Sequence, residues 1–287
     1  MDEKRILITG TNGQLGRALQ SLYPHAIALN HSQLDITNVS ALERFDWSAV
    51  DVIINTAAYT NVDGAETPEG KELADTINHR AVQYLSEVAT KHNLTLVHIS
   101  SDYVFDGSKQ IHDETEPFSP INCYGTSKAD GDTAAAATPK HYIIRTSWVI
   151  GDGKNFVRTM KSLADRGVKP SVVDDQIGRL SFTNTIARGI KHLIDNGAPY
   201  GTYNLTNEGD PASWATIAKC VYGHVGANPD DVTPVTTADY YAGKPGIAPR
   251  PFQSTLDLTK IKATGFTPTD WRTELTSYLE NEPSQEN

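Results

Sequence analysis

The chain has 287 residues, of which 38% are hydrophobic and 21% charged, a composition that suits a soluble globular protein with a sizeable core. Its formal net charge of −10 argues against nucleic-acid binding, which needs a basic patch. Two cysteines, Cys123 and Cys220, are too few for a disulfide framework and favour a reducing compartment. With no apolar signal region after Met1 and no membrane-spanning apolar run, we expect a cytoplasmic protein without a membrane partner.

A glycine-rich turn follows the first apolar run of the chain. The run covers residues 6–8, and the turn reads Thr9-Gly10-Thr11-Asn12-Gly13-Gln14-Leu15-Gly16. A helical stretch over residues 17–22 comes next, and this order of strand, turn and helix is typical of dinucleotide-binding folds. Glycines allow the tight turn and a close approach of the backbone to a pyrophosphate, while the helix N-terminus offers free N–H groups. We therefore predict a cofactor phosphate site at this turn.

The second expected strand covers residues 26–29, and in a dinucleotide fold an acid commonly follows it to bind the adenosine ribose. Here Asn30 takes that place. Asparagine can hydrogen-bond a ribose without repelling a 2′-phosphate, and no arginine follows to hold that phosphate, so NADPH and NADH both remain open. Asp35 could contact the adenine edge, or it could cap the next helix.

Further strands and helices alternate along the first half of the chain. Strands are expected at residues 51–55, 94–99 and 141–145, with a helix around 77–92. This alternation predicts an α/β fold of Rossmann type, a doubly wound parallel sheet. The hydroxyl of Ser101 would lie at the carboxyl end of a central strand, where such sheets bind ligands.

Tyr124 and Lys128 stand four residues apart on an expected helix and so project from one face. A phenol is a weak acid, with an ordinary pKa of about 10. A nearby ammonium favours the phenolate, so we expect Lys128 to lower the pKa of Tyr124 and fit it for proton transfer.

The region after residue 150 is less regular and predicts a smaller, loop-rich C-terminal lobe. We assign residues 1–150 to the NAD(P)-binding domain, with 171–206 returning to it, and residues 151–170 and 207–287 to a substrate lobe. Helices are expected at 155–166, 183–195 and 213–225, and strands at 171–174 and 202–205. The nine histidines form no local metal-ligand pattern, so we expect no catalytic metal.

Several blocks of the sequence resemble one family closely. They are Gly13-Gln14-Leu15-Gly16, the segment from Ala57 to Asp63, the segment from Ser100 to Gly107, the segment from Arg145 to Val149, Asn155-Phe156, Asp175-Gln176 and Arg250-Pro251. Together with Tyr124-x-x-x-Lys128 they resemble the dTDP-4-dehydrorhamnose reductases, a family of extended short-chain dehydrogenase/reductases. The resemblance implies reduction of the C4 keto group of dTDP-4-dehydro-β-L-rhamnose by NADPH or NADH, the last step of dTDP-L-rhamnose synthesis.

The resemblance also implies roles for individual residues. Tyr124 is the expected proton donor, Lys128 binds the nicotinamide ribose, and Ser101 completes the catalytic triad. Cofactor contacts are expected from Gly10, Asn12, Gly13, Gln14, Leu15, Gly16, Asn30, Asp35, Ile36, Ala57, Ala58, Tyr59 and Thr60, besides Tyr124 and Lys128. Substrate contacts are expected from Ser101, Asp102, Trp148 and Arg250. Arg250 suits a diphosphate because a guanidinium offers bidentate donors, but a surface ion pair fits it equally well.

Some positions depart from the family pattern. Serine at position 101 replaces a common threonine, and Ala18 stands where some members carry a glutamate of a metal-linked dimer. We therefore expect a monomer or a weak dimer. The segment from Gly178 to Ser181 looks like that of actinobacterial proteins that fuse a 3,5-epimerase to the reductase, so this chain could be fused to an epimerase or work beside one.

Two other functions remain open at this point. A nucleotide-sugar 4,6-dehydratase or 4-epimerase shares the superfamily, but a dehydratase needs an Asp-Glu pair where this chain has Asp102-Tyr103. A non-catalytic, cofactor-binding regulatory subunit is the second alternative. The intact set of Ser101, Tyr124 and Lys128 argues against it.

Overall fold

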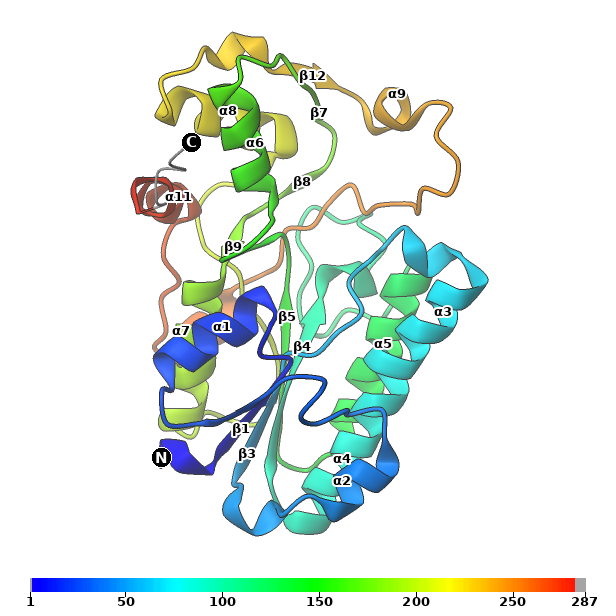
Figure 1. Ribbon diagram of the computed structural model, residues 1–287. Coiled ribbons are helices and arrows are strands. Elements are labelled where there is room, and N and C mark those ends of the chain that lie inside the picture. Colours follow the sequence, from blue (N-terminus) through cyan, green and yellow to red (C-terminus); the bar gives the residue numbers. More distant parts are fainter. Residues whose placement is uncertain (1, 282–287) are drawn as a thin grey trace.

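The computed structural model describes residues 2–281 and shows a lobe built on a central sheet beneath a smaller, mainly helical lobe (Figure 1). The sheet has six strands in the order β10-β5-β4-β3-β1-β2, and every neighbouring pair is parallel. Their bounds are β1 (Ile6–Thr9), β2 (Ile27–Leu29), β3 (Val52–Asn55), β4 (Thr95–Ser101), β5 (His141–Thr146) and β10 (Gly201–Asn204). The expected α/β fold with a doubly wound parallel sheet is confirmed.

The strand order places a crevice at one point of the sheet. From β1 the chain crosses to β2 on one side, and it then returns to β3 on the other side of β1. Successive crossovers therefore diverge, and open α/β sheets bind ligands at such a point, outside the carboxyl ends of the strands.

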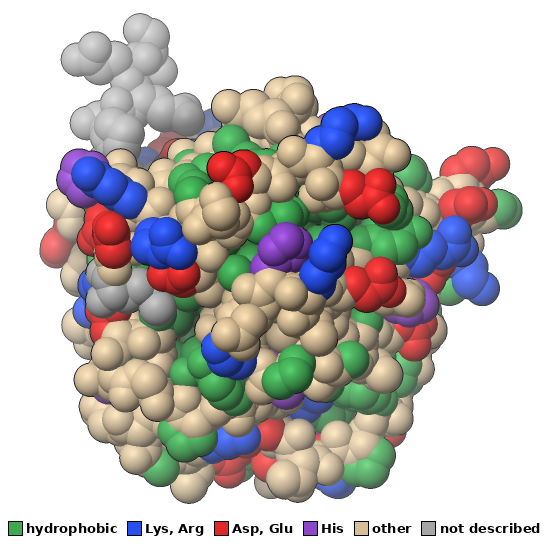
Figure 2. All heavy atoms as spheres, turned by 90° about the horizontal axis from the view of Figure 1, so that it is seen from below, with side chains coloured by type: hydrophobic (Ala, Val, Ile, Leu, Met, Phe, Trp, Pro, Cys, Tyr) green, Lys and Arg blue, Asp and Glu red, His purple; other side chains and the backbone are tan. Residues whose placement is uncertain are grey.

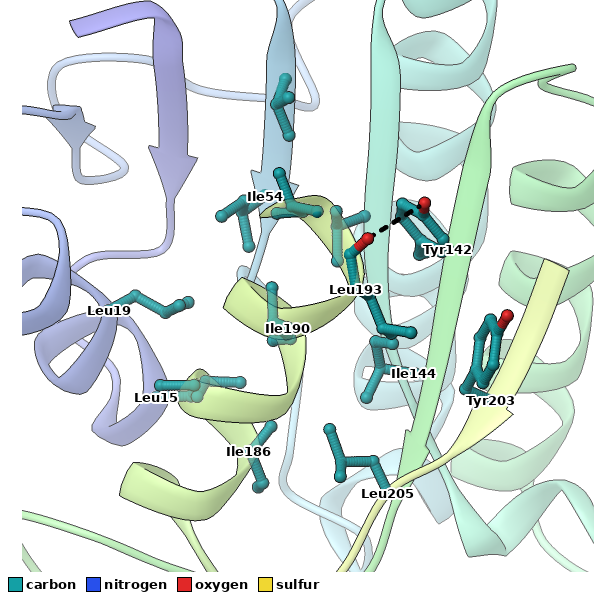
Figure 3. Close-up of a cluster of buried hydrophobic side chains, with 14 of the residues drawn as sticks. Leu15, Leu19, Ile54, Tyr142, Ile144, Ile186, Ile190, Leu193, Tyr203 and Leu205 are labelled. Carbon is teal, nitrogen blue, oxygen red and sulfur yellow. Dashed lines mark hydrogen bonds between the residues drawn. The ribbon is translucent and has the colours of Figure 1, made fainter. Parts of the chain in front are cut away.

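Both faces of the sheet are buried, and alternate residues of each strand point to opposite faces. On β1, Ile6 and Ile8 pack in one core cluster and Leu7 in another. The first cluster lies under α1 (Gln14–Leu22) and α7 (Thr183–Asp195), and Figure 3 shows their leucines and isoleucines facing β3, β5 and β10. The Tyr142 hydroxyl donates to the Leu193 carbonyl across this core at 3.3 Å.

The opposite face is covered by four helices. They are α2 (Val39–Arg44), α3 (Pro68–Asp75), α4 (Ala81–His92) and α5 (Cys123–Ala136). A π-helical turn at Thr76–Arg80 joins α3 to α4, so the expected helix at 77–92 begins earlier and is interrupted. Such turns are frequent at functional sites, and here Asn78 at its centre bonds both the backbone of Tyr59 and the hydroxyl of Ser127 on α5.

The smaller lobe has its own apolar core, which includes Val157, Ile217, Tyr222 and Trp271. Its helices are α6 (Phe156–Asp165), α8 (Trp214–His224), α9 (Thr237–Tyr241) and α11 (Trp271–Glu280). Its short strands pair as β7 (Ser171–Val173) with β12 (Thr233–Val235), β8 (Ile177–Gly178) with β11 (Ala212–Ser213), and β6 (Val149–Ile150) with β9 (Ser181–Phe182). Helix α10 (Thr259–Ala263) contacts β10 of the large sheet, and 3-10 turns lie at Glu3–Arg5, Trp47–Ala49, Gly64–Glu66, Asp102–Val104 and Pro229–Asp231.

The path of the chain between the lobes differs in one detail from the expected division. Residues 171–173 pair with β12 in the smaller lobe, because Val172 packs into its core. The chain rejoins the large sheet at α7 and β10, which begin at residues 183 and 201. The return to the first lobe thus starts near residue 183 rather than 171, and the last six residues of the expected lobe 207–287 lie outside the described part.

Charged side chains are mixed on the face of the large lobe that is farthest from the smaller lobe. Figure 2 shows Lys and Arg interspersed with Asp and Glu there. The net charge of −10 is therefore not gathered into one acidic patch on this face. Of the helices formed by residues 2–281, none is both long and apolar enough to cross a membrane.

Candidate active site

A cavity of about 980 Å³ opens at the carboxyl ends of the parallel strands. Its walls come from the glycine turn after β1, the segments after β3 and β4, helix α5, and Trp148 and Trp214 at the smaller lobe. Expected site residues that line it are Gly10, Asn12, Gly13, Gln14, Leu15, Gly16, Asn30, Ile36, Ala57, Ala58, Thr60, Ser101, Asp102, Tyr124, Lys128 and Trp148. Asp35, Tyr59 and Arg250 lie outside this lining.

Glycine is required at two positions of the turn. Gly10 has a φ of 71°, and a Cβ there would lie 2.5 Å from the backbone nitrogen of Ala57. A Cβ at Gly16 would lie 2.5 Å from the Gly10 carbonyl oxygen. The turn is therefore pressed against both the segment after β3 and the start of α1, which leaves a side-chain-free cradle above it.

The first turn of α1 faces this cradle. Its N-cap is Gly13, which has no side chain to occupy the free N–H groups, so they remain available to an anion. Arg17 and Lys154, two lining residues that sequence reasoning missed, add positive charge. Arg17 donates to the carbonyl oxygens of Asn12 and Asp152 and pairs with the Asp152 carboxylate at 3.1 Å. Its position directly after the glycine turn was the available sequence signal.

The segment after β2 forms the far end of the cavity. Asn30 and Ile36 line it, and the Asn30 side chain accepts hydrogen bonds from the backbone and hydroxyl of Ser32 at 3.0 and 2.7 Å. Asp35 instead accepts from the backbone and hydroxyl of Thr37 at 2.9 and 2.7 Å. It thus fixes a turn ahead of α2, whose N-cap is Asn38.

The segment after β3 is anchored from outside the cavity. Ala57, Ala58 and Thr60 line the cavity, but the Tyr59 hydroxyl lies beside Gly64 and Gly70. The Tyr59 backbone N–H donates to Asn78 at 2.9 Å. Tyr59 therefore supports this wall from behind.

Helix α5 carries Tyr124 and Lys128 into the cavity. Its N-cap, Asn122, accepts from the Gly125 N–H at 2.7 Å and donates to the Pro249 carbonyl at 2.8 Å, which fixes the first turn. The Lys128 ammonium, on a side chain only 2% exposed, donates to the Ile99 carbonyl on β4 at 2.5 Å. Tyr124 packs edge-on against Tyr103, with ring centroids 5.4 Å apart.

Burial dominates the ionisation of both groups. It raises the pKa of Tyr124 to about 12, although the nearby Ser101 hydroxyl opposes the rise. It lowers the pKa of Lys128 to about 8, against the opposing effect of the Asp132 carboxylate. The expectation that the pKa of Tyr124 lies below its ordinary value is therefore wrong for this structure, because removal of the phenolate from water costs more than the Ser101 hydrogen bond returns. Tyr124 is held in its protonated form.

Ser101 is the last residue of β4, and Asp102 follows it; both line the cavity. The Ser101 hydroxyl donates to the Asp102 carboxylate at 3.0 Å, and both residues are buried. Burial raises the pKa of Asp102 to about 6, against the opposing hydroxyls of Ser254 and Ser101. Ser101 faces Thr146 of β5 in the sheet register, two residues before Trp148.

Behind Lys128 lies a second buried set of charges that sequence reasoning missed. Asp132, one turn further along α5, accepts from Arg145 Nε on β5 at 2.9 Å. The His98 ring nitrogen Nε2 lies 4.0 Å from the other carboxylate oxygen of Asp132. Burial lowers the pKa of His98 well below its ordinary value, so the ring is neutral.

Arg250 is engaged by a carboxylate. Its guanidinium makes a two-point contact with Asp63, at 2.5 and 2.9 Å, and also donates to the Ala248 carbonyl at 2.6 Å. The ring of Tyr241 lies 5.4 Å from its centre. The arrangement corresponds to the ion-pair alternative, here joining the segment after β3 to the loop of the smaller lobe.

The described residues include one cluster with metal-ligand chemistry. Asp75, His79 and Asp130 bring three ligand atoms within 4.8 Å of one another. They belong to α3, the π-helical turn and α5, and none of them lines the cavity. A cation bound there would not touch Tyr124 or Ser101.

Comparisons with known proteins show relatives that match nearly the whole chain. A family model described as the RmlD substrate binding domain matches residues 4–283. The dTDP-4-dehydrorhamnose reductase of Aggregatibacter actinomycetemcomitans is 41% identical, covering 94% of this chain and 97% of the relative. The dTDP-4-dehydrorhamnose reductase structure from Clostridium acetobutylicum has a TM-score of 0.88 at 37% identity, covering 96% of this chain and 98% of that one.

A second solved structure was obtained with a ligand. The dTDP-4-dehydrorhamnose reductase of Bacillus anthracis, in complex with NADP, has a TM-score of 0.88 at 33% identity, covering 97% of this chain and 99% of that one. The family resemblance seen in the sequence is thereby confirmed. The chain belongs to the RmlD substrate binding domain family, the family of the dTDP-4-dehydrorhamnose reductases.

Proposed function

We propose that this protein reduces the C4 keto group of dTDP-4-dehydro-β-L-rhamnose to give dTDP-β-L-rhamnose, with NADPH or NADH as the reductant. The observation that carries the proposal is that Ser101, Tyr124 and Lys128 line the same cavity as the glycine turn. A proton donor and a phosphate cradle are thus placed in one site. The names and the NADP complex of relatives at 33–41% identity support the same reaction.

The residues of the cradle fit a dinucleotide. A Cβ at Gly10 or Gly16 would collide with backbone packed behind the turn, so only glycine allows the turn to keep this shape. The α1 N-terminus with Arg17 and Lys154 offers charge complementary to a pyrophosphate. Asn30 and Ile36 would hold the adenosine end, and Ala57, Ala58 and Thr60 the middle of the cofactor. When bound, the reduced nicotinamide supplies the hydride.

Three side chains would then complete the reaction at the keto oxygen. Tyr124, protonated with a pKa of about 12, donates its proton to the developing C4 alkoxide. The Ser101 hydroxyl donates a hydrogen bond to the same oxygen, and the Lys128 ammonium binds the nicotinamide ribose and stabilises the tyrosinate left behind. Asp102 and Trp148 would contact the sugar nucleotide, and Arg250, paired with Asp63, would hold the loop of the smaller lobe beside it.

Four further properties concern the supply of the substrate, the location of the protein, its oligomeric state and the lobe that recognises the sugar nucleotide. A 3,5-epimerase must supply the substrate, either as a separate protein or as a fused domain. We further propose a cytoplasmic location, a monomer or weak dimer, and recognition of the sugar nucleotide chiefly by residues 151–170 and those after 207.

The test supplies the keto sugar by generating it from dTDP-glucose with the upstream dehydratase and epimerase. Oxidation of NADPH or NADH is then measured as loss of the absorbance of the reduced nicotinamide. Tyr124→Phe should lower kcat by at least about 100-fold, the usual scale of a lost general acid, and leave cofactor affinity nearly unchanged. Tyr84→Phe, on α4 and away from the cavity, is the matched control. A Tyr124→Phe variant with wild-type kcat would refute the assignment.

The same assay separates the two alternatives. Product formation without net cofactor oxidation would indicate an epimerase or dehydratase, although Tyr103 stands where a dehydratase needs a carboxylate. Cofactor binding without any turnover, and co-purification with a larger catalytic protein, would indicate a regulatory subunit.

A further inference from the structure

Two stacked indoles form the wall of the cavity at the smaller lobe. The rings of Trp148 and Trp214 have centroids 3.8 Å apart and an interplanar angle of 19°. Both residues line the cavity that contains Tyr124 and Ser101. Trp214 belongs to none of the sequence blocks that identify the family, so its place in the site comes from the structure alone.

Trp148 has an unusual backbone conformation. Its φ is 48°, in the left-handed region that bulky side chains rarely adopt, and such a conformation costs about 1–3 kcal/mol. It persists only where the surroundings impose it. The Trp148 carbonyl accepts from the Ser181 N–H at 3.1 Å, and a Cβ at Gly178 would lie 2.9 Å from the indole. These contacts fix one side of the ring, and Trp214 covers another.

Trp214 is itself held by the smaller lobe. It is the first residue of α8, whose N-cap Ser213 accepts from the Thr216 N–H at 3.0 Å and donates to Asp174 at 2.5 Å. The ring of Phe156 packs against Trp214 with centroids 4.5 Å apart. The stack therefore joins a residue that follows the large sheet to a residue that packs against the core of the smaller lobe.

The sheet register places this wall beside the reacting groups. Ser101 on β4 pairs with Thr146 on β5, and Trp148 follows Thr146 by two residues. Trp148 thus follows closely on the residue paired with Ser101, and both Ser101 and Trp148 line the cavity.

We propose that Trp214 is a positioning residue, which holds Trp148 in place for its contact with the sugar of the nucleotide substrate. This inference rests on the proposed reductase function and deepens it. It gives α8 of the smaller lobe a part in sugar recognition, which Trp214 exerts by holding Trp148. The inference gives Trp214 no role in cofactor binding at the other end of the cavity, around Gly10 and Asn30.

The stack offers a spectroscopic signature that does not depend on turnover. Two stacked indoles couple and give a paired circular-dichroism band. The chain has four tryptophans, and Trp47 packs on Phe45 while Trp271 is covered by Arg272, so the stacked pair is Trp148 with Trp214. Trp214→Leu should abolish the band, and Trp47→Phe, which removes a tryptophan outside the cavity, should retain it. Titration with dTDP-L-rhamnose should change the band in the wild-type protein.

Kinetics with separate variation of the two substrates test the role. In Trp214→Leu we expect KM for the keto sugar nucleotide to rise about three- to tenfold, the scale of one aromatic contact, with KM for NADPH within about twofold. Trp214→Phe keeps an aromatic ring and should recover most of the affinity for the sugar nucleotide, while still lacking the coupled band. If Trp214→Leu does not fold, the titration of the wild-type protein still decides.

Two results would overturn the proposal. One is an unchanged KM for the sugar nucleotide in Trp214→Leu although the band is lost, since Trp214 would then be a core residue only. The other is a wild-type band that dTDP-L-rhamnose does not alter. Failure of the reductase function itself would appear differently, as absence of cofactor oxidation by the wild-type protein.

Discussion

At the scale of single residues, burial decides which form of each ionisable group occupies the cavity. Tyr124 remains a phenol at neutral pH because its pKa is raised to about 12, which suits a donor in the direction of reduction. Lys128 has a pKa of about 8, so it is charged at pH 7 but close to losing its proton. Asp102, whose pKa is raised to about 6, ionises only as the pH approaches neutrality. These groups sit where their charged forms are costly, as catalytic residues commonly do.

Asp102 should therefore oppose folding at neutral pH. Its folded pKa of about 6 lies above the ordinary value of 3.8, so the folded state binds more protons between these limits and stability falls as pH rises through this window. Asp102→Asn removes that loss, and the free energy of unfolding at pH 7 should increase by on the order of 2 kcal/mol. Denaturant unfolding between pH 4 and 7 measures it.

The control for this prediction is Asp113→Asn. Asp113 is exposed, and the Thr115 hydroxyl lowers its pKa, so its removal should not raise stability at pH 7. We also expect Asp102→Asn to lower kcat/KM for the sugar nucleotide about tenfold, because an ionised acceptor is lost from the cavity. An Asp102→Asn protein less stable than wild type at pH 7 would contradict the argument.

At the scale of elements, one face of α5 carries three groups in a row. Tyr124, Lys128 and Asp132 follow one another at intervals of four residues, and Asp132 is paired with Arg145 of β5. The Asp132 carboxylate favours the ammonium form of Lys128. In Asp132→Asn the pKa of Lys128 should fall further, so the decline of NADPH affinity on the alkaline side should begin at lower pH. Equilibrium titration of NADPH from pH 6 to 9 measures this shift.

Two variants separate this effect from general damage. Asp132→Asn leaves the buried Arg145 without its carboxylate partner and should cost about 3–5 kcal/mol of stability. Asp132→Glu keeps the charge, so the pH at which NADPH affinity declines on the alkaline side should stay near that of the wild-type protein. Asp130→Asn, exposed on the same helix, should change neither. An alkaline limit that stays in place in a folded Asp132→Asn protein would show that Lys128 does not sense this carboxylate.

The glycine turn gives a second prediction at this scale. Gly10 and Gly197 both have positive φ, 71° and 57°, but a Cβ at Gly197 meets nothing within 4 Å. Gly197→Ala should thus show the backbone strain alone, about 1 kcal/mol, while Gly10→Ala should add the clash with Ala57 and lose cofactor affinity. Thermal unfolding and NADPH titration compare the two. Equal effects of both substitutions on NADPH affinity would mean that the cradle is not the phosphate site.

At the scale of the whole molecule, the sequence predicts where helices and strands lie better than it predicts which residues contact one another across the fold. Helix α7 runs over Thr183–Asp195, the range expected from its apolar periodicity, and the first five strands of the large sheet lie where apolar runs predict them. The spacing of apolar residues in these elements can be seen within a short stretch of sequence, because burial on one face repeats every few residues. Helices α3, α9, α10 and α11 were not predicted, being short or weakly amphipathic, and of α2 only a helix after Asp35 was expected.

The site follows the same division. The glycine turn, Ser101 and the Tyr124–Lys128 pair could be found because family motifs contain them, and the structure places them in one cavity. Trp214 could not be found, because it reaches the cavity from α8 and no local pattern encodes that approach. Nor could the pairing of Arg250 with Asp63, which joins residues 187 positions apart.

That pairing makes a whole-molecule prediction. Asp63 also accepts from the Ala248 N–H at 3.0 Å, and Asn122 holds the Pro249 carbonyl, so the loop of the smaller lobe is fastened to the large lobe at two points. We expect Asp63→Asn and Arg250→Gln each to raise KM for the sugar nucleotide. The double variant should be little worse than either, with a coupling free energy of about 1 kcal/mol for a partly exposed pair.

The stabilisation by the Asp63–Arg250 pair should depend on pH in a known direction. Arg250 lowers the pKa of Asp63, so the stabilisation is present above the ordinary carboxyl pKa of 3.8 and is lost as pH falls through the lower folded value. The coupling measured at pH 7 should therefore vanish in acid. The exposed pair of Lys161 and Asp165, both on α6, is the control, with a coupling of roughly 0.3 kcal/mol and no effect on KM. If Arg250→Gln raises KM far more than Asp63→Asn, the guanidinium acts on the substrate itself, because a clamp should lose at least as much with Asp63, which also holds the Ala248 N–H.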